Sequence, residues 1–327
     1  MSFKNSSRPS ITVVLTSFNC KQYLPMQIDS ILNQTYQNWN LIIADDGSTD
    51  GTREIAERYS KTHPGIKVIT HRNVGTCKNF ESGLVLANGE YIAVADVDDY
   101  WLPDKLEKGV AYLEDNQHIG MVYHDAKIVD SELNIINSSL MQVQGFLPYS
   151  PQIETLNNLL QRNHVTGPTI MFRNSLSKYL VPFPYGFLQD HWIALIAAEY
   201  SEIGYISEPL VLYRQREGSI QGAAPRGIGF YFRAPFRKGH RVRLLNDLKS
   251  LHNIFEELQT RLRNEGSKNV ILETKLSCYG AFIDILAADT LKEYFYAISK
   301  SFQALILAKD MKMVAYFGYV AMNILIP

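Results

Sequence analysis

Three carboxylates stand close together in the run Asp96-Val97-Asp98-Asp99. Such a run is costly unless water or a cation neutralises it, and a hard divalent cation prefers oxygen ligands. By itself an Asp-x-Asp pattern is more typical of a solvated acidic loop or a helix cap. Because this run directly follows the apolar segment Tyr91 to Ala95, we favour a site in which Asp98 holds a hard divalent cation.

The sequence lacks both common glycine-rich phosphate cradles, G-x-x-x-x-G-K-[ST] and a G-x-G-x-x-G after the first apolar segment. A metal held by Asp98 would instead bridge a diphosphate and stabilise the charge on a departing nucleoside diphosphate. The missing glycine fingerprint also argues against a dehydrogenase. The formal net charge of -1 gives no reason to expect nucleic-acid binding.

A second acidic run, Asp45-Asp46-Gly47-Ser48, also follows an apolar segment. One of its carboxylates could accept a hydrogen bond from a pyrimidine ring N–H, or the run could be a plain Asp-Gly turn. Phe18 could stack on the base, or it could pack in the core. We leave both alternatives open for each residue.

Asp190 precedes the apolar stretch Ile193 to Ala198. It can cap a helix there, and it can also take a proton from an acceptor hydroxyl as a general base. These two roles are compatible. One carboxylate suffices for this chemistry, because a metal-bound diphosphate leaves without needing a proton.

Other side chains could bind the diphosphate or the acceptor, and each also has a purely structural reading. Arg214 and Arg216 could offer cations to the diphosphate, as could Lys78, or all three could lie on a solvated edge. Trp192 could form a sugar platform, although packing is the simpler interpretation, and His191 remains undecided.

These residues need a scaffold, and the sequence predicts an alternating one. The predicted strands of the first third span 11–15, 39–44, 66–70, 91–95 and 120–124, with helical periodicity between them. This order predicts a largely parallel, Rossmann-like α/β sheet with helices on both faces. Ligands of such sheets bind beyond the carboxyl ends of the strands, where the polar residues described above gather.

The periodicity weakens after Ser131, and the polar stretch Asn134 to Gln144 predicts a mobile loop. We place a boundary near Ser219, which divides the chain into a catalytic domain, 1–220, and a mainly helical C-terminal region, 221–327. Residues 225–243 interleave basic and aromatic side chains. This region could contact an anionic membrane surface peripherally, cap the catalytic domain or form a homodimer interface.

The three cysteines, Cys20, Cys77 and Cys278, form no CxxC pair, which favours a reducing compartment. Residues 1–10 are polar and do not resemble a signal peptide, and no run of 18 apolar residues predicts a spanning helix. We therefore expect a cytoplasmic protein.

The chain resembles family-two glycosyltransferases of the GT-A fold over roughly Ser10 to Gly222. The resemblance is carried by ordered motifs: ITVVLTSFN from Ile11, SILNQT from Ser30, DDGSTD from Asp45, NVG from Asn73, GEYI from Gly89, DVDD from Asp96 and PDKL from Pro103. It implies that Thr16, Phe18 and Asp46 contact the nucleoside, that Asp96 approaches the ribose, and that Asp98 holds Mg²⁺ or Mn²⁺. It also implies that Asp190 is the base of a single displacement that inverts the anomeric centre.

A narrower resemblance is to bacterial rhamnosyltransferases, through Asn163-His164-Val165-Thr166-Gly167-Pro168-Thr169 and Gln189-Asp190-His191-Trp192. It implies dTDP-L-rhamnose as donor and a glycan or lipid-linked glycan of a bacterial surface polysaccharide as acceptor, with Thr166 and Gly167 near the acceptor. Gln189 and His191 replace the usual His and Trp, and Arg216 replaces a His. The alternatives are a UDP-sugar transferase, an inactive nucleotide-sugar-binding protein and an assembly protein.

Overall fold

The computed structural model describes residues 8–145, 156–159, 163–184 and 188–215, and a scattered set further along: 249, 252–253, 255–263, 272–273 and 276. The chain divides into two compact units, Met1–Pro225 and Arg226–Pro327, and each is described by itself. Arg216, the basic-aromatic stretch 225–243 and the apolar end of the chain lie outside the described residues.

Four parallel strands form the first half of the sheet: β1 (Ile11–Ser17), β2 (Trp39–Asp45), β3 (Ile66–Thr70) and β4 (Tyr91–Asp96). They lie in the order β3-β2-β1-β4. These strands confirm the predicted ones and extend some of them by one or two residues. Their polar ends therefore meet at one edge of the sheet.

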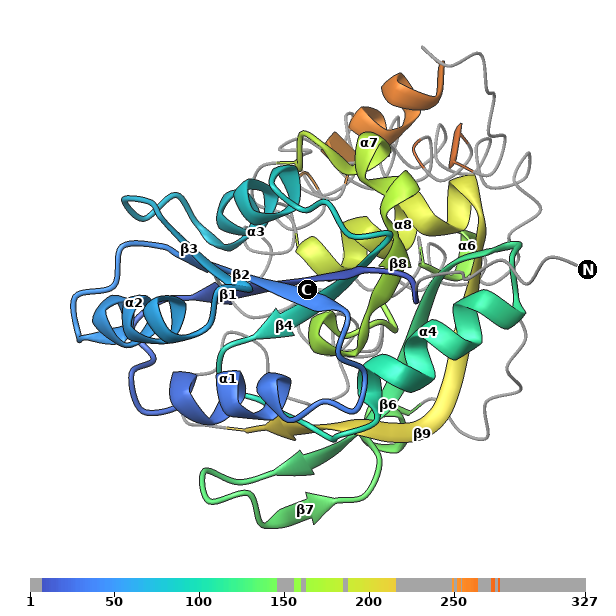
Figure 1. The fold of residues 1–327 in the computed structure, drawn as a ribbon. Coiled ribbons are helices and arrows are strands. Elements are labelled where there is room, and N and C mark those ends of the chain that lie inside the picture. Colours follow the sequence, from blue (N-terminus) through green and yellow to red (C-terminus); the bar gives the residue numbers. More distant parts are fainter. Residues whose placement is uncertain are drawn as a thin grey trace, which may run out of the picture. The chain divides into compact units, whose positions relative to one another are not determined.

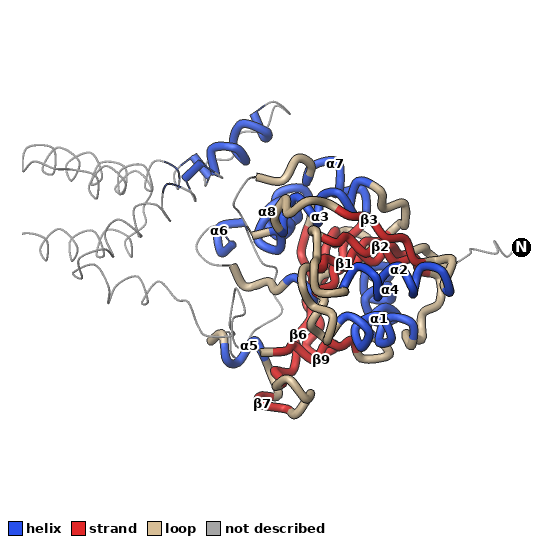
Figure 2. The backbone as a smooth tube through the Cα atoms, turned by 90° about the vertical axis from the view of Figure 1, so that its left-hand side faces the viewer, coloured by secondary structure: helices blue, strands red, loops and turns tan. Residues whose placement is uncertain are grey.

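Helices cover both faces of this sheet, as predicted (Figures 1 and 2). Helices α1 (Leu24–Leu32), α2 (Thr52–Thr62) and α4 (Lys105–Asp115) lie on one face. Helices α3 (Thr76–Val85) and α8 (Gln189–Tyr200) lie on the other. The strands are thus buried on both sides, which explains why β1 reads as a continuous apolar run.

The main core lies between the sheet and the first of these helix layers. Ile11, Val13 and Leu15 of β1 are fully buried there, together with Ile28 of α1 and Leu106 of α4. This is the alternation expected of a strand, with every second side chain on the same face.

Helix α3 can approach the opposite face closely because it carries Gly83. A Cβ atom at this position would lie 2.7 Å from Cγ1 of Val14 and 3.9 Å from Cβ of Ala44. Any larger residue would push α3 away from the sheet and displace the loop before it.

The second half of the sheet is mixed rather than parallel. Strand β8 (Met171–Arg173) pairs antiparallel with both β4 and β6 (Ile119–Val129), and β6 pairs parallel with β9 (Glu202–Arg214). The two-residue β5 (Tyr100–Trp101) adds antiparallel to β9. The predicted strand 120–124 is therefore only the first part of an eleven-residue strand.

Further short helical elements lie in the described part of the first unit. They are α6 (Leu156–Leu159), η1 (Gly167–Thr169), η2 (Asn174–Leu176) and α7 (Ser177–Leu180). Gly167 and Pro168, which belong to the motif that begins at Asn163, lie in η1.

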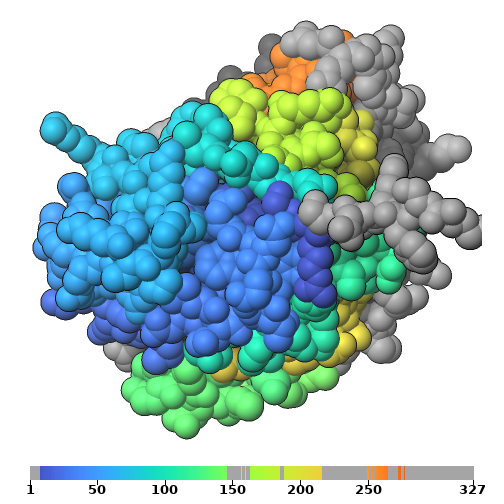
Figure 3. All heavy atoms as spheres, in the orientation of Figure 1, coloured from blue at the N-terminus to red at the C-terminus, as the bar shows by residue number. Residues whose placement is uncertain are grey.

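The prediction of a mobile loop over Asn134 to Gln144 is wrong. This segment contains β7 (Ile135–Asn137), which pairs with β6, and helix α5 (Leu140–Val143). Asp125, which is buried in β6, explains the order: its carboxylate accepts hydrogen bonds from Oγ of Ser139 and the backbone N–H of Met141, at 2.5 and 3.1 Å. The hairpin forms the green projection at the bottom of Figure 3.

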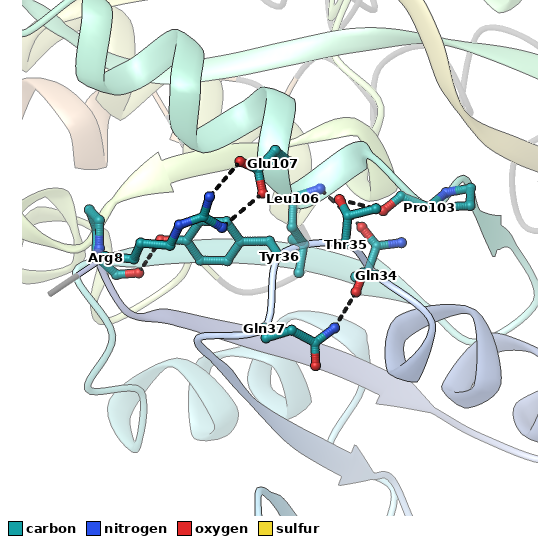
Figure 4. Close-up of polar contacts among 9 residues, drawn as sticks. Arg8, Gln34, Thr35, Tyr36, Gln37, Pro103, Leu106 and Glu107 are labelled. Carbon is teal, nitrogen blue, oxygen red and sulfur yellow. Dashed lines mark hydrogen bonds and ion pairs between the residues drawn. The ribbon is translucent and has the colours of Figure 1, made fainter.

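The connection after α1 fixes the start of α4 (Figure 4). The Gln34 side chain donates to the carbonyl of Leu102 at 2.8 Å and accepts from the N–H of Leu106 at 3.0 Å. The N–H of Thr35 donates to the carbonyl of Pro103 at 2.8 Å. Helix α4 begins two residues after Pro103, and Gln34 anchors the segment that leads to it from the acidic run at 96–99.

In the C-terminal unit, residues 255–263 are helical. Phe255, Leu258 and Leu262 are buried and recur at helical spacing. In the part of the chain that the structure describes, no helix combines the length and the apolar character needed to cross a membrane.

Candidate active site

Strand register brings the predicted nucleoside and metal residues together. Thr16, near the end of β1, is paired with Asp96 at the end of β4, and Ser17 is paired with Asp45 of β2. The N–H of Asp46 donates to the carbonyl of Ser17 at 2.9 Å. The ends of three adjacent strands therefore form one continuous polar edge.

Phe18 follows β1 with 45% of its surface exposed, which is unusual for so large an apolar side chain beside a buried strand. The loop that carries it is pinned to the next one. The N–H of Asn19 donates to Oγ of Ser48 at 2.9 Å, and the N–H of Cys20 donates to Oγ1 of Thr52 at 2.8 Å. An exposed ring on a fixed loop is suited to stacking on a flat base.

Asp46 is buried and joins the second strand end to the loop before α3. Its two carboxylate oxygens accept from the N–H groups of Val74 and Gly75, at 2.6 and 2.9 Å. A carboxylate offers about four acceptor positions, so each oxygen retains one for a ligand. Its neighbour Asp45 is occupied locally, accepting from the side chain and N–H of Ser48.

The acidic run at the end of β4 separates into partly exposed and buried members. Asp96 and Asp98 are partly exposed, whereas Asp99 is only 1% exposed. Burial, followed by the charges of Asp98 and Asp190, raises the pKa of Asp96 to about 7. Negative charge is thus concentrated at the crevice, where a cation would relieve it.

Asp99 is turned into the protein. One of its oxygens accepts from the N–H of Arg214 at 3.0 Å. Lys105, also buried, lies with Nζ 3.9 Å from the ring centre of Trp101; burial lowers its pKa to about 7, although the charge of Asp99 opposes this effect. Asp99 and Lys105 therefore offset each other inside the protein, and Asp99 acts as an anchor for the acidic run.

Arg214 is almost fully buried, 3% exposed, and its cation is used within the protein. Its Nε donates to the carbonyl of Asp98 at 2.7 Å, and its Nη1 donates to the carbonyls of Asp130 and Ser131. The guanidinium also lies over the ring of Tyr23. Arg214 thus holds the backbone of the acidic run at 96–99, and its guanidinium is occupied by protein carbonyl groups.

Asp190 occupies the first turn of α8. Its Oδ1 accepts from Nδ2 of Asn163 at 3.1 Å and from the N–H of His191 at 2.6 Å. Burial raises the pKa of this carboxyl to about 6, although the hydrogen bonds from His191, Gly167 and Asn163 lower it. A carboxylate with such a pKa is well matched to accept a proton near neutral pH.

Gly167 shows how near Asp190 lies to the acidic run. A Cβ atom on this glycine would be 3.6 Å from Oδ2 of Asp96, 3.8 Å from Nε2 of Gln189 and 3.9 Å from Cβ of Asp190. The end of β4 and the start of α8 therefore meet at one point, although they are 94 positions apart in the sequence.

The remaining predicted residues are engaged elsewhere. Trp192 is fully buried and donates from Nε1 to the carbonyl of Leu180 at 2.9 Å, so it packs. Nε2 of His191 lies 2.8 Å from the carbonyl of Leu159, and burial lowers the pKa of this histidine to about 4. Lys78 is exposed and pairs with Glu81 at 2.7 Å. Thr166 is partly exposed, and its carbonyl accepts from Thr169.

The donor chemistry at the end of β4 fits a hard divalent cation. Asp98 is a partly exposed carboxylate, and its charge, after burial, helps to raise the pKa of the neighbouring Asp96. Among the described residues, no three His, Cys, Asp or Glu side chains form a metal-binding group. Asp98, with Asp96 beside it, would hold such a cation, which would supply charge stabilisation for a bound diphosphate.

Sequence reasoning missed the roles of three residues. Asn163 supports Asp190, and Lys105 offsets Asp99, yet both had been noted only as parts of motifs. Burial and then the charges of Asp99, Asp96, Asp98 and Asp190 raise the pKa of Tyr213, so its ring lies within electrostatic reach of the whole cluster. Its position directly before Arg214 was the available signal.

Known proteins share this architecture. A glycosyltransferase of uncharacterised function from Haemophilus influenzae is 33% identical over 218 residues, which are 63% of this chain and 65% of that protein. The UDP-Glc:alpha-D-GlcNAc-diphosphoundecaprenol beta-1,3-glucosyltransferase WfgD of Escherichia coli is 29% identical over 64% of this chain and 79% of its own length. The chain thus covers slightly less than two thirds of the first relative.

Two solved structures share the fold. TarS 1-349 of S. aureus in complex with UDP-GlcNAc has a TM-score of 0.55 at 19% identity, over 90% of this chain and 89% of that one. Mannosyltransferase PcManGT from Pyrobaculum calidifontis, in complex with GDP-Man and Mn²⁺, has a TM-score of 0.51 at 19% identity, over 97% and 81%. These likenesses confirm the predicted GT-A fold.

The sequence model of the family named Glycosyl transferase family 2 matches residues 12–180, slightly more than half of the chain. That range contains the polar ends of β1 and β2, the acidic run at the end of β4 and the η1 turn that carries Gly167. The chain belongs to glycosyltransferase family 2.

Proposed function

We propose that this protein transfers a sugar from a nucleoside diphosphate sugar to a hydroxyl group of a glycan, in one displacement that inverts the anomeric centre. The observation that carries the proposal is the meeting of Asp96 and Asp190 at Gly167. It sets the acidic end of β4, suited to a metal-bound diphosphate, directly beside a carboxylate suited to deprotonate an acceptor.

The chain's own residues would divide the work between two sides of the crevice. Phe18 would stack on the base, Asp46 would accept from the base, and Thr16 and Asp96 would line the path to the ribose. Asp190, held by Asn163, would take the acceptor's proton as its oxygen attacks the anomeric carbon. Lys78 would have to leave Glu81 to reach the diphosphate.

Asp98 is the residue that we expect to hold Mg²⁺ or Mn²⁺. When bound, the metal would supply charge stabilisation for the departing diphosphate. The Mn²⁺ and GDP-Man named together in the mannosyltransferase structure support a metal in this fold. Arg216, which lies outside the described residues, stays a proposed cation for the same diphosphate.

Two observations bear on the identity of the donor sugar, and they favour different donors. The rhamnosyltransferase-like motifs around Asn163 and Asp190 favour dTDP-L-rhamnose. The relative WfgD is named as a UDP-Glc-dependent glucosyltransferase, and the structural neighbour TarS 1-349 was solved in complex with UDP-GlcNAc. These two proteins favour a UDP-hexose or UDP-N-acetylhexosamine as the donor. Both donors have a pyrimidine base, as the proposed contacts of Phe18 and Asp46 require.

For the acceptor we propose a lipid-linked glycan of a bacterial surface polysaccharide. The diphosphoundecaprenol substrate in the name of the E. coli relative supports this class. Transfer would then take place at the cytoplasmic face of the membrane. The C-terminal region, 221–327, would contact that membrane peripherally or form a homodimer.

The direct test is Asp190→Asn. This variant should lose transfer by about three orders of magnitude and should bind the donor with nearly unchanged affinity, because it removes only the proton acceptor. Asp115→Asn, an exposed carboxylate at the end of α4, is the matched control and should remain active. Loss of donor binding in Asp190→Asn would reject its assignment as the base.

Calorimetric titration with dTDP, UDP and GDP, each with and without Mn²⁺, would identify the base and the metal dependence. Selective dTDP binding favours rhamnose, and selective UDP binding favours the alternative donor. In Asp98→Ala the effect of Mn²⁺ on affinity should disappear. Equal affinity with and without Mn²⁺ in the wild type would count against a metal at Asp98, and binding of none of the three would favour an assembly role.

A further inference from the structure

We propose that Gln189 binds a hydroxyl group of the sugar being transferred and so determines which donor sugars the enzyme accepts. The inference rests on the proposed function, because it concerns the donor of that reaction. It goes further by naming the side chain that would recognise the sugar.

The position of the carboxamide is the first observation. Gln189 is the first residue of α8 and is 93% buried, with 7% of its surface exposed. The point where a Cβ atom would stand on Gly167 lies 3.8 Å from Nε2 of Gln189. Oδ2 of Asp96 and Cβ of Asp190 are both within 4 Å of the same point. The amide therefore borders the place where the donor and base sides of the crevice meet.

The second observation is that the protein does not satisfy this amide. Among the described residues, Oε1 of Gln189 has no hydrogen-bond partner, although the atom is buried. An unpaired buried amide oxygen destabilises the folded protein. By contrast, the partly buried side chain of Asn163, which contacts the adjacent Asp190, is held by specific hydrogen bonds. The orientation of the Gln189 amide is thus left to be set by a ligand.

The chemistry of the surroundings identifies the kind of ligand. A carboxylate oxygen of Asp96 is the atom nearest to this point, and Asp190 adjoins it through Cβ, so a phosphate or another anion would be repelled there. A cation would be drawn to the carboxylates, and it would gain less from a neutral amide. A sugar hydroxyl is uncharged, and it can both donate to Oε1 and accept from Nε2.

The position of the Gln189 amide indicates whether the hydroxyl group belongs to the donor sugar or to the acceptor. Asp96 belongs to the strand end that carries the proposed ribose and metal contacts, and its Oδ2 lies nearest to the Gly167 point. A group at this point is therefore on the donor side, next to the diphosphate. We assign the hydroxyl to the transferred sugar rather than to the acceptor.

The absence of a side chain on Gly167 is consistent with this assignment. The three distances of 3.6 to 3.9 Å are ordinary van der Waals contacts, so the folded protein has room for one methyl group here. Glycine leaves that room empty for the substrate. Gly167→Ala should therefore fold and yet obstruct the sugar.

The test compares binding of a nucleoside diphosphate alone with binding of its sugar conjugates, by calorimetry with Mn²⁺ present and no acceptor. The probes use the base selected in the nucleotide titration; for UDP they are UDP, UDP-glucose and its C4 epimer UDP-galactose. Gln189→Met keeps the length of the side chain and removes both hydrogen-bonding atoms. Gln117→Met, at an exposed glutamine beyond α4, is the matched control.

We expect Gln189→Met to bind the preferred sugar nucleotide roughly tenfold more weakly, the equivalent of one hydrogen bond, and to lose most of its discrimination between epimers. Its affinity for the nucleoside diphosphate alone should not change. Gly167→Ala should show the same pattern, which keeps the test valid if Gln189→Met folds poorly. Gln117→Met should match the wild type throughout.

Two results would overturn the inference. One is unchanged affinity and unchanged epimer discrimination in both variants, as expected if the amide faces the acceptor or only packs. The other is an equal loss of affinity for the nucleoside diphosphate alone, which would indicate a general disturbance of the crevice. Failure of the wild type to bind any nucleotide would instead reject the proposed function itself, so the two failures are distinguishable.

Discussion

At the scale of single residues, Asp190 shows how opposing effects set a proton affinity. Burial favours the neutral carboxyl, whereas the hydrogen bonds from His191, Gly167 and Asn163 favour the charged form. The balance leaves the pKa at about 6, above the ordinary aspartate value. A base in this range is charged at neutral pH and yet takes up a proton more readily than an ordinary aspartate.

Asn163→Ala should shift the pH dependence of transfer. The amide of Asn163 donates to the carboxylate at 3.1 Å and stabilises its charged form. Removing it should raise the pKa of Asp190, so the acidic limb of kcat/KM should move from near pH 6 upward by about one unit. The profile is measured with saturating metal at each pH.

The control for that experiment is Asn40→Ala. The Asn40 side chain pairs with Asn88 at the start of β2, the opposite end of the strand from the crevice. This variant should keep the wild-type profile. If Asn163→Ala lowers the rate equally at every pH, Asn163 supports the loop and does not tune Asp190.

The sequence indicated which residue types could serve in the site, but it did not indicate where their side chains point. Asp46 was predicted as a base-binding carboxylate, and the structure adds that it also clamps the N–H groups of Val74 and Gly75. Arg214 was predicted as a diphosphate ligand, yet its guanidinium is enclosed by carbonyl groups from other segments. Partners that are distant in sequence decide such roles, and no local pattern reveals them.

At the scale of elements, the junction of α1 and α4 is held by one side chain. Gln34 is 1% exposed and makes hydrogen bonds to Leu102, Leu106 and Ser30. Gln34→Ala would leave the buried N–H of Leu106 unpaired, and it would remove one of the two hydrogen bonds that the carbonyl of Leu102 accepts. We expect the free energy of unfolding to fall by about 3 kcal/mol, as measured by urea denaturation.

Gln117→Ala provides the comparison for that measurement, because this exposed glutamine bonds only to the nearby carbonyl of Glu114. Its effect should stay within about 0.5 kcal/mol, as for most surface substitutions. An equally small effect of Gln34→Ala would mean that packing of Leu106 and Ile31, rather than Gln34, positions α4.

The elements themselves were predictable in the first half of the chain and less so in the second. Strands β1 to β4 are buried on both faces and connected by helices, so their apolar runs and short turns were legible. Strands β8 and β9 pair with partners from other parts of the chain, and β9 includes polar and exposed residues such as Glu208. Helix α5 was missed because its order depends on Asp125, fourteen or more residues earlier.

At the scale of the whole molecule, the chemistry of the site reduces stability near neutral pH. The pKa of Asp190 is raised in the folded protein, so its stabilising contribution is fully present below about pH 4 and is lost as the pH rises through about 6. Burial lowers the pKa of His191 to about 4. The stabilising contribution of this histidine is therefore lost as the pH falls below the ordinary histidine pKa, which opposes the gain from Asp190. The pH dependence of the wild-type free energy of unfolding therefore combines both groups, and it cannot be assigned to Asp190 or His191 alone.

The difference between Asp190→Asn and the wild type isolates the carboxylate, because His191 is present in both proteins. Without substrate, the variant should equal the wild type near pH 4 and exceed it at pH 8 by up to about 3 kcal/mol, since asparagine does not ionise. Urea denaturation at the two pH values measures this. A gain in stability together with the loss of transfer would show that the variant fails in chemistry and not in folding. If Asp190→Asn is no more stable than the wild type at pH 8, the pKa of Asp190 is not raised. The argument that this carboxyl is suited to act as a general base would then fail.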